Sequence, residues 1–266
     1  PDEVLIANSS FHRSTDGGLT FPPGGGGGCG DCHDIWIDPT NGDHWVATGD
    51  GGMGITRDHA KSFFSVSLPI GQMYHVAVDD QVPYWLYSNR QDDGTMRGPS
   101  TSPVPVTNVP SYSSAQAGRG GGRGGGGGGV AWQPNIGGCE SGFTIPQPGN
   151  PDIIWATCYG NEVTRFDNRL GTARSVAPWI HTLDSEPNKV KYRCHWTPPL
   201  AFDPFEKETV YYGCQYIFKT SDQGQTWSII SPDLSTQDPT RIVSSGGVIG
   251  DNLGQFYGEV VFAIAP

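Results

Sequence analysis

The sequence lacks long apolar runs and helical periodicity. No stretch approaches the ~20 apolar residues that a membrane-spanning helix needs, and the longest apolar run is 260–265. No window of about a dozen residues places apolar side chains at spacings of three and four, the spacing that marks an amphipathic helix. We therefore expect no membrane-spanning segment and no helical domain.

Positive charge is also scarce. Lys and Arg together number 16, whereas Asp and Glu number 27, so the formal net charge is −11 at pH 7. A protein that binds nucleic acid generally presents a basic surface. This composition predicts that nucleic acid is not a partner.

Turn-forming residues, by contrast, are abundant. The 39 glycines and 22 prolines separate short runs of β-branched and aromatic side chains. Runs of this kind, bounded by Gly, Pro, Asp or Asn, are typical of short strands. The sequence therefore predicts an all-β chain of antiparallel strands. The runs are 4–6, 35–37, 44–47, 74–78, 84–87, 153–156, 210–212 and 217–218.

An eight-residue pattern, Ser/Thr-x-Asp-x-Gly-x-Thr-aromatic, occurs at 14–21 and 220–227, with a divergent third copy at 56–63. Asp16 and Asp58 lie 42 residues apart, and one four-stranded propeller blade has roughly 40–45 residues. The repetition indicates one hairpin for each blade of a repeat protein, in which each blade is stabilised by its neighbours.

The chemistry of this octet is that of a turn. Its carboxylate accepts hydrogen bonds from the hairpin's own N–H groups, its glycine supplies positive φ, and its last aromatic ring packs between sheets. A residue needed in every blade serves the blade, so we predict structural and not catalytic roles for these positions. They are Asp16, Gly18, Phe21, Asp58, Phe63, Asp222, Gly224 and Trp227.

The octets resemble the Asp-box, or BNR repeat, of sialidases, sortilin-type receptors and xyloglucan hydrolases. Other phrases resemble a large group of secreted bacterial Asp-box propeller proteins, often labelled glycosyl hydrolases. The resemblance implies a β-propeller of four-stranded antiparallel blades in a secreted, periplasmic or cell-surface protein. The phrases are His33-Asp-Ile-Trp36-Ile-Asp-Pro39, Gly49-Asp-Gly-Gly52, Gly71-Gln-Met-Tyr-His75-Val, Arg90-Gln-Asp92, Arg97-Gly-Pro-Ser100, Cys139-Glu-Ser-Gly142 and Ser231-Pro-Asp-Leu234.

About five to six blades are visible in the sequence. Because members of the family often carry seven, we expect residues 1–266 to form a partial propeller, with the remaining blades supplied by a longer parent chain or by a partner. A Ser/Pro-rich and then Gly/Arg-rich insert at 101–130 is expected to be a mobile loop. The units are 1–21, 33–64, 71–99, 140–176 and 192–230, with 246–266 opening a sixth.

The six cysteines suggest an oxidising compartment. The motif Cys29-Gly-Asp-Cys32-His33 matches the attachment signature of c-type haem, and its alternative is a local disulfide between Cys29 and Cys32. The other four cysteines suit two disulfides whose connectivity the sequence leaves open, and their spacing predicts no metal site. They are Cys139, Cys158, Cys194 and Cys214.

Candidate catalytic groups fall in Gly-rich turns outside the octets. A glycoside hydrolase of the xyloglucanase type needs two carboxylates facing across a groove, and the candidates are Asp34, Asp50, Asp92, Asp93 and Glu140. A sialidase needs a tyrosine nucleophile and several arginines, because Arg pairs bidentately with a carboxylate. The arginines are Arg13, Arg90, Arg97, Arg165 and Arg193, and the tyrosines are Tyr74, Tyr192 and Tyr257.

The recurrent signals build the disc, and no set of acid, base and nucleophile stands out. We therefore expect a module that binds a protein, peptide or glycan, without a cofactor. Periodic tryptophans are expected to pack between blades, although one or two at a rim could stack on sugar rings. The alternatives are a glycoside hydrolase and a haem-bearing module through Cys29, Cys32 and His33. The tryptophans are Trp36, Trp45, Trp85, Trp155, Trp196 and Trp227.

Overall fold

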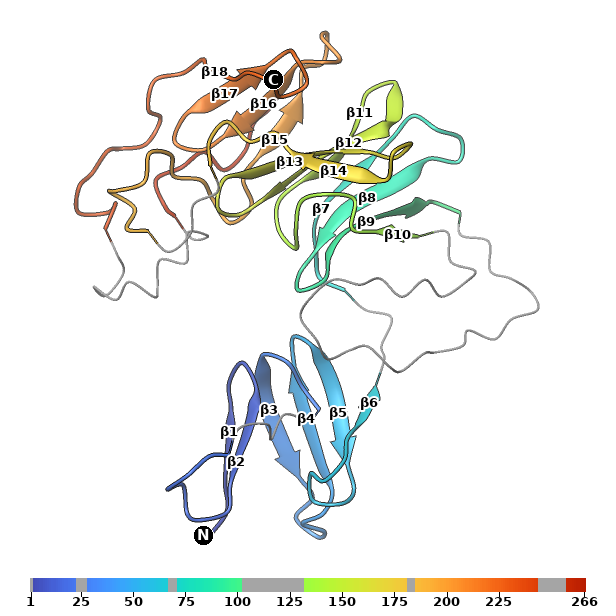
Figure 1. Ribbon diagram of the computed structural model, residues 1–266, viewed down its shortest axis with the longest axis vertical. Helices are drawn as coiled ribbons and strands as arrows, with labels where there is room; N and C mark the ends of the chain where they lie inside the picture. The colour runs from blue at the N-terminus through green and yellow to red at the C-terminus, as the bar shows by residue number, and fades with distance from the viewer. Residues whose placement is uncertain (1, 23–27, 67–70, 102–131, 181–184, 244–256) are drawn as a thin grey trace. The chain divides into compact units, whose positions relative to one another are not determined.

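The computed structural model contains eighteen β-strands and, in the residues it describes, no helix (Figure 1). The strands form one two-stranded and four four-stranded sheets, and every pairing between them is antiparallel. The predicted all-β class with four-stranded antiparallel blades is confirmed, as four blades and a fragment. The described residues are 2–22, 28–66, 71–101, 132–180, 185–243 and 257–266.

The chain divides into two compact units. Among the described residues, unit 1 contains 2–22 and 28–66. Its core is formed by Phe11, Trp45 and Cys32, against which Leu5 and Ile35 pack. The strands of unit 1 are β1 (Val4–Ala7), β2 (Phe11–Ser14), β3 (Cys32–Ile37), β4 (Trp45–Gly49), β5 (Gly52–Thr56) and β6 (Phe64–Val66). They pair as β1-β2 and β3-β4-β5-β6.

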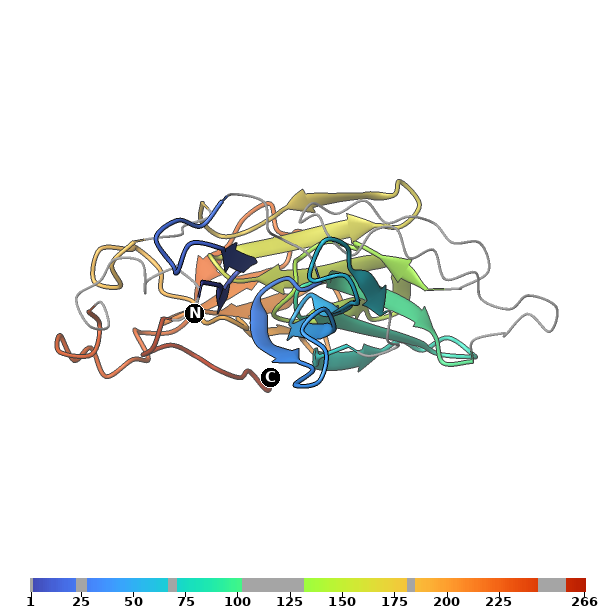
Figure 2. The ribbon, with the colours of Figure 1, turned by 90° about the horizontal axis from the view of Figure 1, so that it is seen from below.

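Unit 2 contains three four-stranded sheets, each with its strands side by side in chain order. The sheet that contains the yellow strands β13 and β14 is seen in both views (Figure 1, Figure 2). The first sheet consists of β7 (Met73–Val78), β8 (Trp85–Arg90), β9 (Gly94–Pro99) and β10 (Gln133–Pro134). The second consists of β11 (Thr144–Gln147), β12 (Asn150–Cys158), β13 (Glu162–Asp167) and β14 (Thr172–Ser175). The third consists of β15 (Leu200–Phe202), β16 (Val210–Gly213), β17 (Ile217–Thr220) and β18 (Ser228–Ile229).

The first strands of these three sheets are neighbours, because β11 contacts both β7 and β15. Aromatic side chains pack between the second and third sheets. The Trp227 ring lies 6.4 Å from the Trp155 ring and 6.2 Å from the Tyr212 ring, centroid to centroid. Its Nε1 donates to the Val176 carbonyl at 2.6 Å. The last aromatic residue of this octet therefore joins two sheets.

The three octets occupy equivalent positions: each follows the third strand of a meander, or β2 in the fragment. In each of them one carboxylate oxygen accepts the backbone N–H four residues later at 2.9 Å. The other oxygen accepts the hydroxyl of that same residue at 2.6 Å. Hydrogen bonds to the ionised form lower the pKa values of Asp16, Asp58 and Asp222 from 3.8 to about 2.

The blade-like units expected from the sequence correspond only in part to the observed sheets. The first has only two strands, and the described part of the last, 257–266, contains none. The insert expected at 101–130 falls between β9 and β10, the hairpin position that the octets occupy elsewhere. Apart from residue 101 it lies outside the described residues, so its predicted mobility stays a prediction.

The octet carboxylates predict a specific acid response. Asp58→Ala removes the acceptor for the Ser62 N–H and hydroxyl and for the Thr56 hydroxyl. Since the folded pKa is about 2 and the unbonded value is 3.8, the wild-type stabilisation is present above pH 3.8 and is lost as the pH falls towards 2. The difference in Tm between wild type and variant should therefore shrink across this window. Calorimetry checks this, and a difference independent of pH contradicts it.

The matched control is Asp34→Ala, in the same unit. The Asp34 carboxylate is exposed and accepts a hydrogen bond from the next residue, Ile35, at 2.8 Å. This variant should have a wild-type Tm at every pH in the window.

Candidate functional site

A group of acidic, amide and aromatic side chains gathers at one end of the sheets of unit 2. In an antiparallel meander, the turn between the second and third strands lies at the same end as the chain leading into the first strand. The octet hairpin of unit 2, between β17 and β18, lies at the opposite end. We call the group the Glu140 surface; it consists of Tyr74, Gln91, Asp92, Glu140, Tyr159 and Trp196.

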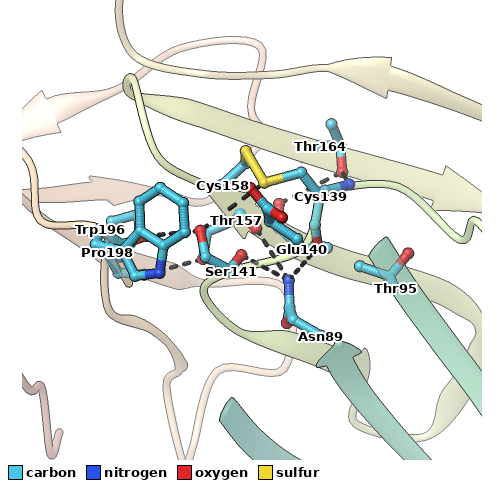
Figure 3. Close-up of a disulfide and its surroundings, with 12 residues drawn as sticks. Asn89, Thr95, Cys139, Glu140, Ser141, Thr157, Cys158, Thr164, Trp196 and Pro198 are labelled. Atoms are coloured by element: carbon cyan, nitrogen blue, oxygen red, sulfur yellow. Dashed lines mark hydrogen bonds between the residues drawn. A yellow bond between two sulfur atoms is a disulfide. The ribbon is translucent and has the colours of Figure 1, made fainter. Parts of the chain in front are cut away.

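The loop that carries Glu140 is fixed on both sides (Figure 3). Cys139 forms a disulfide with Cys158, at the end of β12. Asn89, on β8, has a fully buried side chain whose Nδ2 donates to the carbonyls of Cys139 at 2.9 Å and Ser141 at 2.7 Å. The Ser141 hydroxyl in turn donates to the Trp196 carbonyl at 2.8 Å. The Glu140 backbone is thereby held between two sheets.

The aromatic part of the surface is a stack of two half-buried rings. The Tyr159 and Trp196 rings lie 4.5 Å apart, centroid to centroid, with 8° between their planes. Trp196 Nε1 donates to the Tyr74 hydroxyl at 2.7 Å, and this hydroxyl donates to Gln91 Oε1. The ring orientations are therefore fixed by hydrogen bonds as well as by packing.

The carboxylates of Asp92 and Glu140 lie on either side of one amide. Gln91 Nε2 is 3.1 Å from Asp92 Oδ1 and 3.4 Å from Glu140 Oε2. The Asp92 backbone N–H donates to Glu140 Oε2 at 2.9 Å. The structure thus brings together two of the predicted candidate acids, which come from different sheets.

Burial raises the pKa of Glu140 above its usual value of 4.5, and the negative charge of Asp92 acts in the same direction. The bond from the Asp92 N–H and a bond from the Tyr159 hydroxyl partly oppose this shift. Burial, followed by the charge of Glu140, also raises the pKa of Tyr159. Glu140 can therefore hold a proton at a higher pH than an exposed glutamate.

The other candidate acids make contacts of their own. Asp34 and Asp50 belong to unit 1. Asp50 Oδ1 is 2.9 Å from His33 Nε2, and both side chains are exposed. Asp93, in the same turn as Asp92, pairs with Arg90 at 3.7 Å.

Of the residues considered for a sialidase, Tyr74 belongs to the Glu140 surface, and the others are engaged separately. Tyr192 packs in the core between the second and third sheets, whereas the buried Tyr257 donates its hydroxyl to the Ser185 carbonyl at 2.7 Å. The arginines have different partners. Arg13 pairs with Glu3, and Arg97 donates to the Gln133 side chain and the Pro151 carbonyl. Arg165 lies opposite Trp155 and Arg174 on the two neighbouring strands, and Arg193 donates to the Ser235 hydroxyl.

All six cysteines are paired: Cys29 with Cys32, Cys139 with Cys158 and Cys194 with Cys214. Three disulfides indicate a non-cytoplasmic compartment.

Covalent c-type haem requires both sulfurs of its motif as thioethers, so the disulfide form of Cys29 and Cys32 does not fit haem attachment. His33, the second residue of β3, lies on a strand and next to Asp50. The prediction of haem is tested by an absorbance spectrum of the purified protein. Within the described ranges, no group of three or more His, Cys, Asp or Glu side chains could hold a metal ion.

A hollow of about 380 Å³ lies away from the Glu140 surface, where the first strands of the three unit-2 sheets meet. His75 lines it and stacks on Phe143, with ring centroids 3.8 Å apart. Burial lowers the pKa of His75, which favours the neutral ring. Its lining is largely aliphatic and aromatic, and it lacks the acids and amides of the Glu140 surface.

The sequence did not reveal Asn89, Gln91 or Tyr159 as parts of a site. Trp196 was expected to pack between blades; it does join two sheets, but in the loop ahead of β15, where its ring is half-buried. The phrases Arg90-Gln-Asp92 and Cys139-Glu-Ser-Gly142 stand far apart in the sequence. Nothing in their spacing shows that they meet.

No known family profile matches the chain, and neither does any curated protein. Solved structures similar to it include YCF48 bound to D1 peptide, with 15% identity and a TM-score of 0.36, covering 88% of this chain and 66% of that one. A GH74 xyloglucanase from Xanthomonas campestris shows 14% identity and a TM-score of 0.35, covering 87% and 37%. An auxiliary nutrient binding protein from Bacteroides thetaiotaomicron shows 12% and 0.38, covering 79% and 44%.

This chain thus spans less than two thirds of each of these structures, and similarity at this level carries no argument about function. In the described part of the chain, no helix has the length and apolarity needed to cross a membrane.

Proposed function

We propose that the protein is a secreted or surface-exposed binding module, and that a glycan docks on the Glu140 surface. The observation that carries the proposal is the Tyr159–Trp196 stack beside Glu140. The loop that carries Glu140 is fixed by a disulfide and by Asn89. A pre-organised site binds with little further loss of conformational freedom. The three disulfides suit an extracytoplasmic setting.

The chemistry of the surface favours a sugar over an apolar ligand. Aromatic side chains with polar tips combine an apolar face with hydrogen-bonding groups. The neighbouring carboxylates of Asp92 and Glu140 and the amide of Gln91 offer acceptors and donors for sugar hydroxyls. The protein's net charge of −11 disfavours a polyanionic ligand. A neutral polysaccharide meets these conditions best.

A glycoside hydrolase is the second candidate. The raised pKa of Glu140 suits a proton donor, and Asp92 supplies a second carboxylate. Hydrolysis, however, uses carboxylates that flank the scissile bond, whereas Asp92 and Glu140 share the Gln91 amide on one side of the loop. We therefore place binding first.

The proposal predicts loss of glycan affinity in Trp196→Ala. Titrating neutral polysaccharides and their oligosaccharides into the protein, by calorimetry and tryptophan fluorescence, should identify a ligand for the wild type. Removing the stacked ring should weaken its affinity about tenfold, equivalent to ~1.4 kcal/mol. Trp179→Ala is the control, because Trp179 is exposed on the same connection but stacks on Lys191.

The outcomes separate the candidates. Binding without turnover, weakened in Trp196→Ala and retained in Trp179→Ala, supports the proposal. Release of reducing ends that is abolished in Glu140→Gln supports the hydrolase. Binding confined to a peptide panel, or equal glycan affinity in wild type and Trp196→Ala, overturns the glycan site.

A further inference from the structure

The disulfide between Cys29 and Cys32 differs in kind from the other two. It closes a ring between cysteines three positions apart, whereas the other pairs are separated by 19 and 20 positions. In the chain-entropy account, the stabilisation from a cross-link grows with the length of the loop that it closes. The short ring therefore contributes least to folding. Its two thiols also remain close together after reduction.

The backbone of residues 28–32, which we call the CGDC loop, is held without help from the disulfide. The Cys32 N–H donates to the Asn8 carbonyl at 2.6 Å, and the Asp31 N–H donates to the Ser9 carbonyl at 3.1 Å. On the other side, the Gly51 N–H donates to the Gly30 carbonyl at 3.0 Å. Breaking the sulfur–sulfur bond leaves these bonds in place.

The surface beneath the loop is shaped to receive it. A Cβ at Gly49 would lie 2.3 Å from the Asp31 carbonyl oxygen, and a Cβ at Gly54 would lie 2.2 Å from the Gly28 Cα. The loop thus lies directly on the glycines of β4 and β5. This close packing keeps the two cysteines near each other in either redox state.

The two sulfurs of the loop differ in access. Cys32 is 7% exposed, whereas Cys29 is half-buried. Cys139 is also half-buried, so partial access alone does not distinguish the loop. Cys194 and Cys214 are 2% and 0% exposed. The CGDC loop alone combines a partly accessible sulfur with a short ring and with backbone bonds that survive reduction.

We propose that Cys29 and Cys32 form a thiol–disulfide exchange site that accepts electrons from an external thiol without unfolding unit 1. The partner class is a low-molecular-weight thiol or a protein dithiol. Cys-x-x-Cys pairs are the usual arrangement for such exchange, and exposed disulfides are the labile ones.

The exchange proceeds in two steps. An external thiolate attacks the Cys29 sulfur and forms a mixed disulfide, and Cys32 leaves as a thiolate that takes a proton from solvent. A second thiol then attacks the mixed disulfide, releasing the oxidised partner and the Cys29 thiol. Two electrons and two protons pass from two thiols to the protein, and one disulfide is exchanged for another.

The test uses the native protein in glutathione buffers of increasing reduced fraction, at equilibrium and without denaturant. Free thiols are quenched with iodoacetamide, and each cysteine is quantified by peptide mass spectrometry. For each cysteine we compare the value of [GSH]²/[GSSG], the squared concentration of reduced glutathione divided by that of oxidised glutathione, at which half of it is alkylated. This value should be at least tenfold lower for Cys29 and Cys32 than for the other four cysteines. Circular dichroism should be unchanged at that point, and oxidised glutathione should restore the bond.

A pair of single variants identifies the attacked sulfur. Cys32→Ser leaves Cys29 free and should accumulate a mixed disulfide with glutathione. Cys29→Ser leaves the buried Cys32 free and is the matched control, expected to do so at least tenfold more slowly. If all three disulfides open together, if Cys29–Cys32 opens last, or if its opening coincides with loss of the β signal, the proposal is wrong. The wild-type titration decides this even if a variant fails to fold.

Discussion

Gly54→Ala should destabilise unit 1 by ~3 kcal/mol or more, one of the two largest effects expected from a single substitution. The added Cβ would lie 2.2 Å from the Gly28 Cα and 2.6 Å from its carbonyl oxygen. Both are backbone atoms, so no side chain can move aside. Overpacking of a closely packed region costs roughly 1–3 kcal/mol and occasionally more. Denaturant unfolding followed by circular dichroism measures the loss.

The control for this substitution is Gly42→Ala. A Cβ at Gly42 meets nothing within 4 Å, so its free energy of unfolding should change by less than ~0.5 kcal/mol. Gly49→Ala provides a second test, because its Cβ would lie 2.3 Å from the Asp31 carbonyl oxygen. If Gly54→Ala and Gly49→Ala are as stable as Gly42→Ala, the CGDC loop does not lie on β4 and β5.

The glycines also show what the sequence could and could not reveal. Short apolar runs bounded by turn residues predicted the antiparallel strands, and each octet follows either the third strand of a four-stranded sheet or the second strand of the two-stranded one. A glycine within a strand, such as Gly54, suggests a close approach of another backbone. Nothing in the sequence, however, identifies Gly28 as the backbone that approaches it. That contact depends on how a loop folds back across unit 1.

The candidate site was less accessible to sequence analysis than the fold. Asp92 and Glu140 are both candidates because they lie in Gly-rich turns, but they are 48 residues apart in sequence. Their proximity results from the packing of two sheets, which local spacing does not encode. Disulfide connectivity was open for the same reason, since four cysteines allow three pairings. Tyr159 and Trp196 carry no motif, and their stacking follows from the same packing of sheets.

Asn89 links the fold to the candidate site, because it bonds the Glu140 loop while lying fully buried on β8. Its Nδ2 is shared among the carbonyls of Cys139, Ser141 and Thr157, at 2.9, 2.7 and 3.3 Å. Its Oδ1 accepts the Thr144 hydroxyl at 2.7 Å. A single side chain on the first sheet thus satisfies polar groups of the second sheet and of the loop that leads into it.

Asn89→Ala should therefore lower the free energy of unfolding by about 3–4 kcal/mol, since each buried polar group left unpaired costs ~1–3 kcal/mol. Asn188→Ala, at an exposed turn position, should cost less than ~0.5 kcal/mol. Folded Asn89→Ala should also bind glycan more weakly than Asn188→Ala. The loop carrying Glu140 then loses its hydrogen bonds to Asn89 and is held by the Cys139–Cys158 disulfide. Denaturant titration and calorimetry measure the two effects. A cost below ~1 kcal/mol would mean that water replaces the amide, and that the disulfide alone positions Glu140.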